Sequence, residues 1–142
     1  MLEFLSDGIK IAYLDRLPAA GAPPRDRPVL LIHGFASHTD MNWVSTGWVS
    51  HLAEAGYRVI SIDNRGHGRS GKPHDSEAYS AGIMAEDARR LLDHLGVPRA
   101  HVIGYSMGAR IAALLAVGHP ELVDHLVLGG LGLALVEGMA AT

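Results

Sequence analysis

The sequence predicts an α/β fold, with a mostly parallel central sheet of about six strands and helices on both faces. Short apolar segments rich in β-favouring residues alternate with segments of helical spacing, which is typical of strands connected through helices. The segment PVLLI is β-favouring without interruption, as expected of a strand buried on both faces. The predicted strands are Leu2–Leu5, Ile9–Leu14, Pro28–Ile32, Tyr57–Ile62, His101–Tyr105 and His125–Leu128.

The first half of the chain predicts a hairpin followed by a strand, a helix and a further strand. Asp7-Gly8 is a favoured two-residue turn between the first two strands. A loop rich in Pro, Gly and Ala, Pro18–Arg27, precedes the third strand. Helical spacing then runs from Trp43 to Ala55 and ends at Gly56, because glycine favours the residue just past a helix.

The second half begins with a long loop and continues with two helices. Turn-forming and polar residues from Asp63 to Tyr79 predict a surface loop. Ser80 is a typical N-cap for a helix that ends near Leu95, where a glycine and a proline follow. Another helix is predicted from Met107 to about Gly118, and Gly129–Thr142 predicts no element of its own.

The composition excludes several classes of function. A chain of 142 residues that is 48% apolar has the size and polarity of one globular domain. Twelve basic against fifteen acidic residues give a net charge of −3, without a patch suited to nucleic acid. The absence of cysteine excludes disulfides, thiolate nucleophiles and cysteine-based zinc sites. With no secretory signal and no long apolar run, we expect a cytoplasmic protein without a membrane partner.

The strongest local signal is the G-x-S-x-G pentapeptide Gly104-Tyr105-Ser106-Met107-Gly108. This pattern is expected by chance in about one of eight chains of this composition, so the identification of the motif depends on the elements that flank it. It joins a predicted strand directly to a predicted helix. The glycines then permit a strained turn that exposes the Ser106 hydroxyl at the positive end of the helix. The alternative is a helix start that Ser106 only caps.

Two further motifs follow predicted strands at the same edge of the sheet. His33-Gly34-Phe35 comes after the third strand, where the amides of Phe35 and Met107 could form an oxyanion hole. We interpret His33 as a residue that orders this loop rather than as a proton-transfer group.

The segment DNRGHGRS, residues 63–70, predicts a tight structural turn in which Asp63 and Arg65 satisfy backbone groups and each other. A phosphate cradle is less favoured, because Lys72 is misplaced for a P-loop.

In this order, HGF, DNRGHGRS and GYSMG resemble the α/β-hydrolase superfamily in its esterase and lactonase-like branch, from Pro28 to Leu131. The resemblance implies that Ser106 is the nucleophile, that Phe35 and Met107 supply the oxyanion amides, and that no metal or cofactor is needed. The serine argues against the epoxide hydrolase and dehalogenase branches, which carry aspartate at this position. Residues implied to support the site are His33, Gly34, Gly104, Tyr105 and Gly108.

The family's triad acid and histidine follow the nucleophile and lie beyond the sixth strand. Thirty-six residues follow Ser106. His119 would lie about 20 Å away along the helix, and His125 would lie at the opposite edge of the sheet. Residues 1–142 are therefore expected to form a single, incomplete domain without the cap and the last strands. The histidines expected at the correct edge are His33, His38 and His67.

The leading hypothesis is a serine hydrolase that acts on a small-molecule carboxylic ester, thioester or lactone through an acyl-enzyme. Turnover by this chain alone should be weak, because a serine without a base is a poor nucleophile. The alternatives are a C–C hydrolase or perhydrolase of the same fold, a non-catalytic interaction subunit, or a gene fragment. The segment His125–Leu128 would be an edge strand, which predicts self-association through it.

Overall fold

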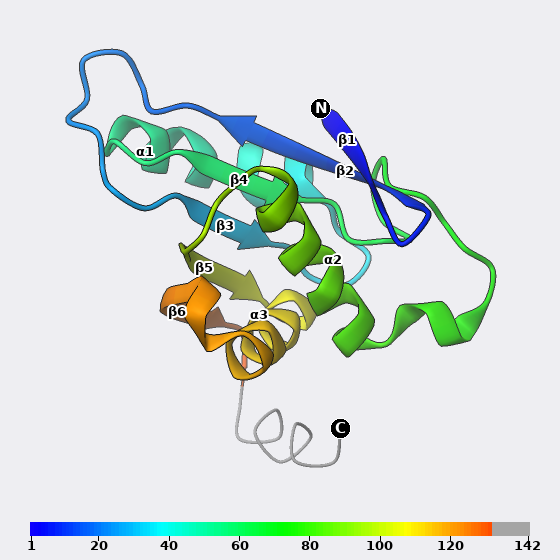
Figure 1. The fold of residues 1–142 in the computed structure, drawn as a ribbon. Coiled ribbons are helices and arrows are strands. Elements are labelled where there is room, and N and C mark those ends of the chain that lie inside the picture. Colours follow the sequence, from blue (N-terminus) through cyan, green and yellow to red (C-terminus); the bar gives the residue numbers. More distant parts are fainter. Residues whose placement is uncertain (132–142) are drawn as a thin grey trace.

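A computed structural model, which describes residues 1–131, contains one six-stranded sheet with helices on both faces (Figure 1). The strand order is β1-β2-β4-β3-β5-β6. β1 and β2 are antiparallel, as are β2 and β4, whereas the other three neighbouring pairs are parallel. The predicted fold class is confirmed. The strands are β1 (Leu2–Ser6), β2 (Ile9–Arg16), β3 (Val29–Ile32), β4 (Val59–Ile62), β5 (Ala100–Tyr105) and β6 (Val123–Gly129).

The opening hairpin forms as predicted, with a longer second strand. Asp7 and Gly8 have φ values of 48° and 81°, the left-handed backbone that a two-residue hairpin turn requires. β2 continues past the predicted end to Arg16 because its last residues pair with β4. The guanidinium of Arg58 also donates two hydrogen bonds to Asp15, at 2.9 and 2.8 Å, which joins this end of the strand to β4.

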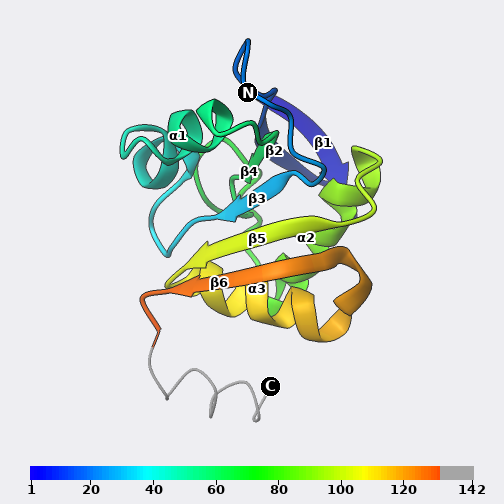
Figure 2. The same cartoon turned by 90° about the vertical axis from the view of Figure 1, so that its left-hand side faces the viewer.

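The sheet separates two hydrophobic cores, and β3 contributes to both. Leu30 and Ile32 pack in the larger core, together with helices α2 (Ala81–His94) and α3 (Met107–Gly118). Val29 and Leu31 point to the other face, where α1 (Trp48–Glu54) covers them. Figure 2 shows this layered arrangement. All four side chains are buried, which explains why the segment is apolar without alternation.

The helix predicted from Trp43 to Ala55 is two separate segments, so this prediction was wrong. Residues Asp40–Val44 form a short π-helical turn, η1, and α1 begins only at Trp48. Gly47 lies between them with φ of 88°, a left-handed conformation that interrupts the helix. Shorter 3₁₀ turns occur at η2 (Ser76–Tyr79), inside the predicted loop, and at η3 (Pro120–Leu122).

β6 forms one edge of the sheet among residues 1–131 and is longer than predicted. Leu126 packs against the larger core, but Val127 is 52% and Leu128 39% exposed. Apolar side chains of this strand therefore remain accessible on an open edge. Self-association through this strand stays a prediction. Within the described residues, none of the helices is long and apolar enough to cross a membrane.

Candidate active site

Ser106 lies in a sharp turn between the end of β5 and the start of α3. Its backbone has φ of 56° and ψ of −117°, an unfavourable conformation for a residue with a side chain. The Ser106 amide donates to the carbonyl of Gly129 at 2.9 Å, and its own carbonyl accepts from Ala109 at 3.0 Å. The side chain makes no capping hydrogen bond, and the residue is exposed. Ser106 therefore precedes α3 as an exposed serine on a strained turn, and its side chain does not cap the helix.

The glycines that flank Ser106 permit β3, β5 and α3 to approach one another closely. A Cβ atom on Gly104 would overlap the carbonyl of Gly108. A Cβ atom on Gly108 would overlap the carbonyl of Ile32 and approach that of His33 to 2.5 Å. Because these neighbours are backbone atoms, neither position has room for a side chain.

Replacing Gly108 by alanine is expected to lower the free energy of unfolding by about 1–3 kcal/mol, as overpacking does. Helix propensity alone would instead raise the free energy of unfolding by up to about 1 kcal/mol, so a decrease would indicate overpacking at Gly108. Gly118→Ala, at the other end of α3, is the matched control because nothing lies within 4 Å of its Cβ position. Urea unfolding measures both variants. Equal changes in the free energy of unfolding of the two variants would contradict the close approach of the chain at Gly108.

The loop after β3 lies directly against this turn. A Cβ atom on Gly34 would be 3.4 Å from the Cβ of Ser106. The Gly34 amide donates to the side-chain oxygen of Asn42 at 3.0 Å, and its carbonyl accepts from the amide of Ser37 at 3.3 Å. Ala36 has φ of 58° within this tight turn. The predicted juxtaposition of the two motifs is therefore present.

Two backbone amides in this region have no hydrogen-bond acceptor among residues 1–131. Met107 is the first residue of α3, so its amide has no acceptor within the helix. The amide of Phe35, at the centre of the loop turn, likewise has no hydrogen-bond acceptor among residues 1–131. These are the two amides that the sequence predicted for an oxyanion hole.

His33 is buried, and both of its ring nitrogens are engaged. Nδ1 donates to the carbonyl of Gly34 at 2.7 Å, and Nε2 accepts from the amide of Asn64 at 3.0 Å. Burial lowers the pKa of His33 to about 4, which keeps the ring neutral at pH 7. The ring therefore connects two loops and has no nitrogen left to take a proton from Ser106.

Acid is expected to destabilise the fold through His33. In the unfolded chain this histidine binds a proton below about pH 6.5, whereas in the folded chain it does so only near pH 4. The unfolded state therefore gains protons first, and the free energy of unfolding should fall by about 2 kcal/mol from pH 7 to pH 5. Urea unfolding at both pH values measures this. A His33→Gln variant should show a flatter pH dependence, whereas His74→Gln, on an exposed loop, should keep the wild-type slope.

The loop of residues 63–70 forms a tight turn, but one predicted contact within it is absent. The carboxylate of Asp63 accepts from the amides of Thr39 and Arg69, at 2.8 and 3.0 Å, as expected. Arg65 was predicted to pair with Asp63 and instead pairs with Asp87 of α2, at 2.7 and 2.8 Å. Backbone amides already occupy both oxygens of Asp63, so the guanidinium binds the buried carboxylate on the helix.

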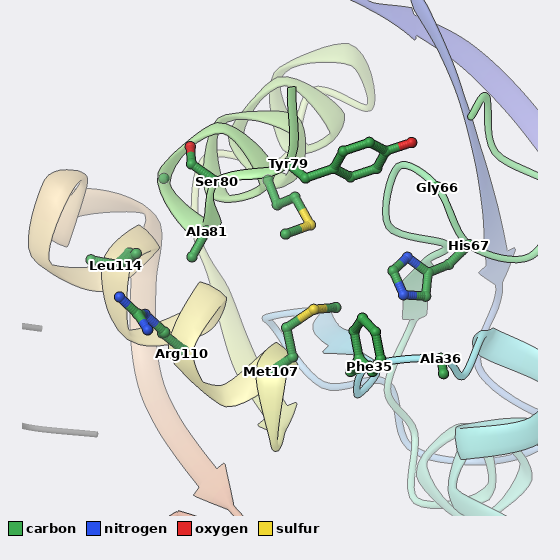
Figure 3. Close-up of a pocket in the computed structure, with 12 residues that line it drawn as sticks. Phe35, Ala36, Gly66, His67, Tyr79, Ser80, Ala81, Met107, Arg110 and Leu114 are labelled. Atoms are coloured by element: carbon green, nitrogen blue, oxygen red, sulfur yellow. The ribbon is translucent and has the colours of Figure 1, made fainter. Parts of the chain in front are cut away.

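A cavity of about 900 Å³ opens beside the turn (Figure 3). Phe35 and Met107 line one side, and Tyr79 lies across from them. Sequence reasoning placed neither Arg110 nor Leu114 in the site. Their positions four and eight residues after Ser106, on one face of α3, are the signal that could have identified them. The full lining is Phe35, Ala36, Gly66, His67, Tyr79, Ser80, Ala81, Gly82, Met84, Met107, Arg110 and Leu114.

No histidine among residues 1–131 forms a hydrogen bond with the Ser106 hydroxyl. His67 reaches the cavity, and its Nδ1 donates to the carbonyl of Arg65 at 3.0 Å. His119 lies at the far end of α3 with Nε2 2.9 Å from Glu86. His125 lies at the start of β6, beside β5. The last two are thus remote from the turn, as predicted from their positions in the chain.

Comparison with known proteins finds the same fold. A probable hydrolytic enzyme from Pseudomonas aeruginosa PAO1 superposes with a TM-score of 0.77 and 40% identity, over 89% of this chain and 39% of that one. An N-acyl homoserine lactone degrading enzyme superposes with a TM-score of 0.76 and 31% identity, over 89% of this chain and 44% of that one. Epoxide hydrolase 4 of Mus musculus is 35% identical over 116 residues, which are 80% of this chain and 31% of the mouse protein.

The chain thus spans between 31% and 44% of the length of these three proteins. The family model for the alpha/beta hydrolase fold matches residues 27–137, a range that includes all three motifs around the turn. The protein therefore belongs to the alpha/beta hydrolase fold family.

Proposed function

We propose that the protein is a serine hydrolase that acts on a carboxylic ester, thioester or lactone through an acyl-enzyme on Ser106. The observation that carries this proposal is the strained backbone of the exposed residue Ser106, immediately before α3. Such strain persists only where the surrounding structure enforces it, and it concentrates at functional sites. Here the close glycine contacts of β3, β5 and α3 enforce it.

The chemistry follows from the groups around this serine. The Ser106 oxygen would attack the carbonyl carbon, and the resulting oxyanion would accept hydrogen bonds from the amides of Phe35 and Met107. One such donor lowers the barrier by about 2.7–4 kcal/mol. The alcohol, thiol or ring oxygen would leave with a proton, and water would then release the acid. The proposal places the general base outside residues 1–131, so turnover by this chain alone should be weak.

The serine at position 106 favours an ester-like substrate over an epoxide, although many of the relatives that this chain matches are epoxide hydrolases. Apolar side chains such as Met84 and Leu114 line the cavity beside Met107, which suits the hydrocarbon part of an acyl group. One structural relative degrades N-acyl homoserine lactones. Epoxide hydrolases are also among the relatives, but that branch carries aspartate at the position of Ser106.

The proposal is tested by incubating the chain with a fluorophosphonate probe and mapping the adduct by peptide mass spectrometry. We expect one slow adduct, on Ser106, whose formation added imidazole accelerates by acting as a base. An aryl ester should acylate the same serine, whereas styrene oxide should leave it unmodified. Absence of any adduct, or an adduct on another residue, would overturn the proposal.

A further inference from the structure

A second cluster of titratable side chains lies at the edge of the sheet opposite Ser106. It consists of His101 near the start of β5 and of Asp124 and His125 near the start of β6. The Nδ1 atoms of the two histidines are 3.1 Å apart, and Oδ1 of Asp124 is 3.8 Å from Nδ1 of His125. One potential ligand atom of each residue lies within 4.8 Å of the other two. The proposed hydrolase chemistry uses none of these residues.

A β-bulge brings the three side chains together. Ala100 pairs with Val123, and Val102 pairs with Leu126, so one residue of β5 faces two residues of β6 between these pairs. The residue on β5 is His101, and the two on β6 are Asp124 and His125. In a regular strand two consecutive side chains point to opposite faces. Here the bulge turns both toward His101, and bulges commonly re-aim side chains in this way.

Neighbouring side chains hold these groups in position. The ring of His101 packs edge-on against Tyr57, with centroids 6.0 Å apart. The carboxylate of Asp124 lies 3.3 Å from Nε of Arg27 and 3.6 Å from Nη2 of Arg99. Burial lowers the pKa of His101; the carboxylate of Asp124 opposes this shift, and His125 and Arg27 add to it.

We propose that His101, Asp124 and His125 bind one divalent transition-metal ion of borderline softness, of which Zn²⁺ is the natural probe. Two nitrogens bound to tetrahedral zinc at 2.0–2.1 Å lie about 3.3–3.4 Å apart, and the observed separation of 3.1 Å is slightly shorter than this. Imidazole nitrogens select such ions over Mg²⁺ and Ca²⁺, which prefer oxygen ligands. Arg27 and Arg99 orient the carboxylate but also repel a cation, so the affinity should be moderate.

The test is calorimetric titration of the tag-free chain with zinc chloride at pH 7.5. We expect one saturable equivalent of zinc, with binding weakened at least tenfold in His101→Asn and in His125→Asn and lost in the double variant. His74→Asn is the control, because His74 is an exposed histidine on a loop elsewhere. Zinc should also raise the thermal midpoint of the wild-type chain but not that of the double variant, whereas Mg²⁺ should raise neither.

Two results would overturn the proposal. One is a double variant that binds zinc as tightly as the wild-type chain. The other is a wild-type chain without saturable binding up to roughly 1 mM zinc. The His125 side chain is 76% exposed, so its replacement should leave the fold intact, and circular dichroism checks this for every variant. The outcome is independent of the proposed hydrolase function, because neither readout involves Ser106.

Discussion

Ser106→Ala is expected to lower the rate of fluorophosphonate labelling by roughly 10²–10³-fold, the contribution of the oxyanion amides alone, to the background of the other hydroxyl groups. The variant removes the attacking oxygen and leaves the two open amides and the cavity in place. Alanine also retains the Cβ, so the strained backbone conformation is no harder to adopt than it is for serine. Gel fluorescence over a time course measures the labelling, and urea unfolding should show little change in stability.

The matched control for this variant is Ser80→Ala. Ser80 lines the cavity directly, but its hydroxyl accepts from the amide of Ile83 at 3.1 Å and caps α2. Its loss should therefore cost about 1 kcal/mol of stability and leave the labelling rate unchanged. If Ser106→Ala were labelled as fast as the wild-type chain, Ser106 would not be the nucleophile. If Ser80→Ala alone lost the label, the reactive serine would be at the other side of the cavity.

The turn at Ser106 could be predicted because the residues that signal it are local in sequence. Gly104 and Gly108 lie two residues to either side of the serine, and each has a backbone neighbour that excludes a side chain. The strand before the turn and the helix after it each carry an apolar pattern that a short window reveals. The position of the Phe35 loop followed from the same rule, because parallel strands end at one edge of the sheet.

Features that depend on distant partners could not be predicted in this way. Gly47 is an exception, because its left-handed conformation is local, but the helical spacing from Trp43 to Ala55 outweighed that signal in the prediction. The choice of Asp87 by Arg65 depends on how α2 packs over the loop, a contact between residues 22 positions apart. The register shift that gathers His101 with its two neighbours on β6 is likewise a property of strand pairing, not of either strand alone.

Arg65→Met should lower the free energy of unfolding by up to about 3–5 kcal/mol, because it leaves the buried carboxylate of Asp87 with only the more distant Arg90, at 4.0 Å, as a neighbouring cation. Asp87 is fully buried and accepts from Nε and Nη2 of Arg65 and from the hydroxyl of Ser6, the last at 2.6 Å. Arg65 is 4% exposed, and the hydrogen bond with Asp87 raises its pKa. The free energy of unfolding of a folded domain is about 5–15 kcal/mol, so this one substitution would remove a large share of the stability. Urea unfolding at pH 7 measures it.

Two further variants separate the unpaired charge from lost packing. Arg89→Met removes an arginine whose partners on α2, Glu86 and Asp93, are solvent-exposed, and it should cost about 0–1 kcal/mol. The double variant Arg65→Met, Asp87→Leu has no buried charge left and should regain most of the stability that Arg65→Met alone loses. If the double variant were as unstable as Arg65→Met alone, the lost stability would come from the packing of the loop of residues 63–70 and not from the unpaired charge.

The same pair also connects stability to the candidate active site. Arg65 immediately precedes Gly66 and His67, which line the cavity, and its carbonyl accepts the hydrogen bond from the His67 ring. Its side chain thus anchors this wall of the cavity to α2. The double variant removes that anchor without leaving a charge, so it should fold yet form the fluorophosphonate adduct on Ser106 more slowly than the wild-type chain. An unchanged labelling rate would show that the wall keeps its position through backbone contacts alone.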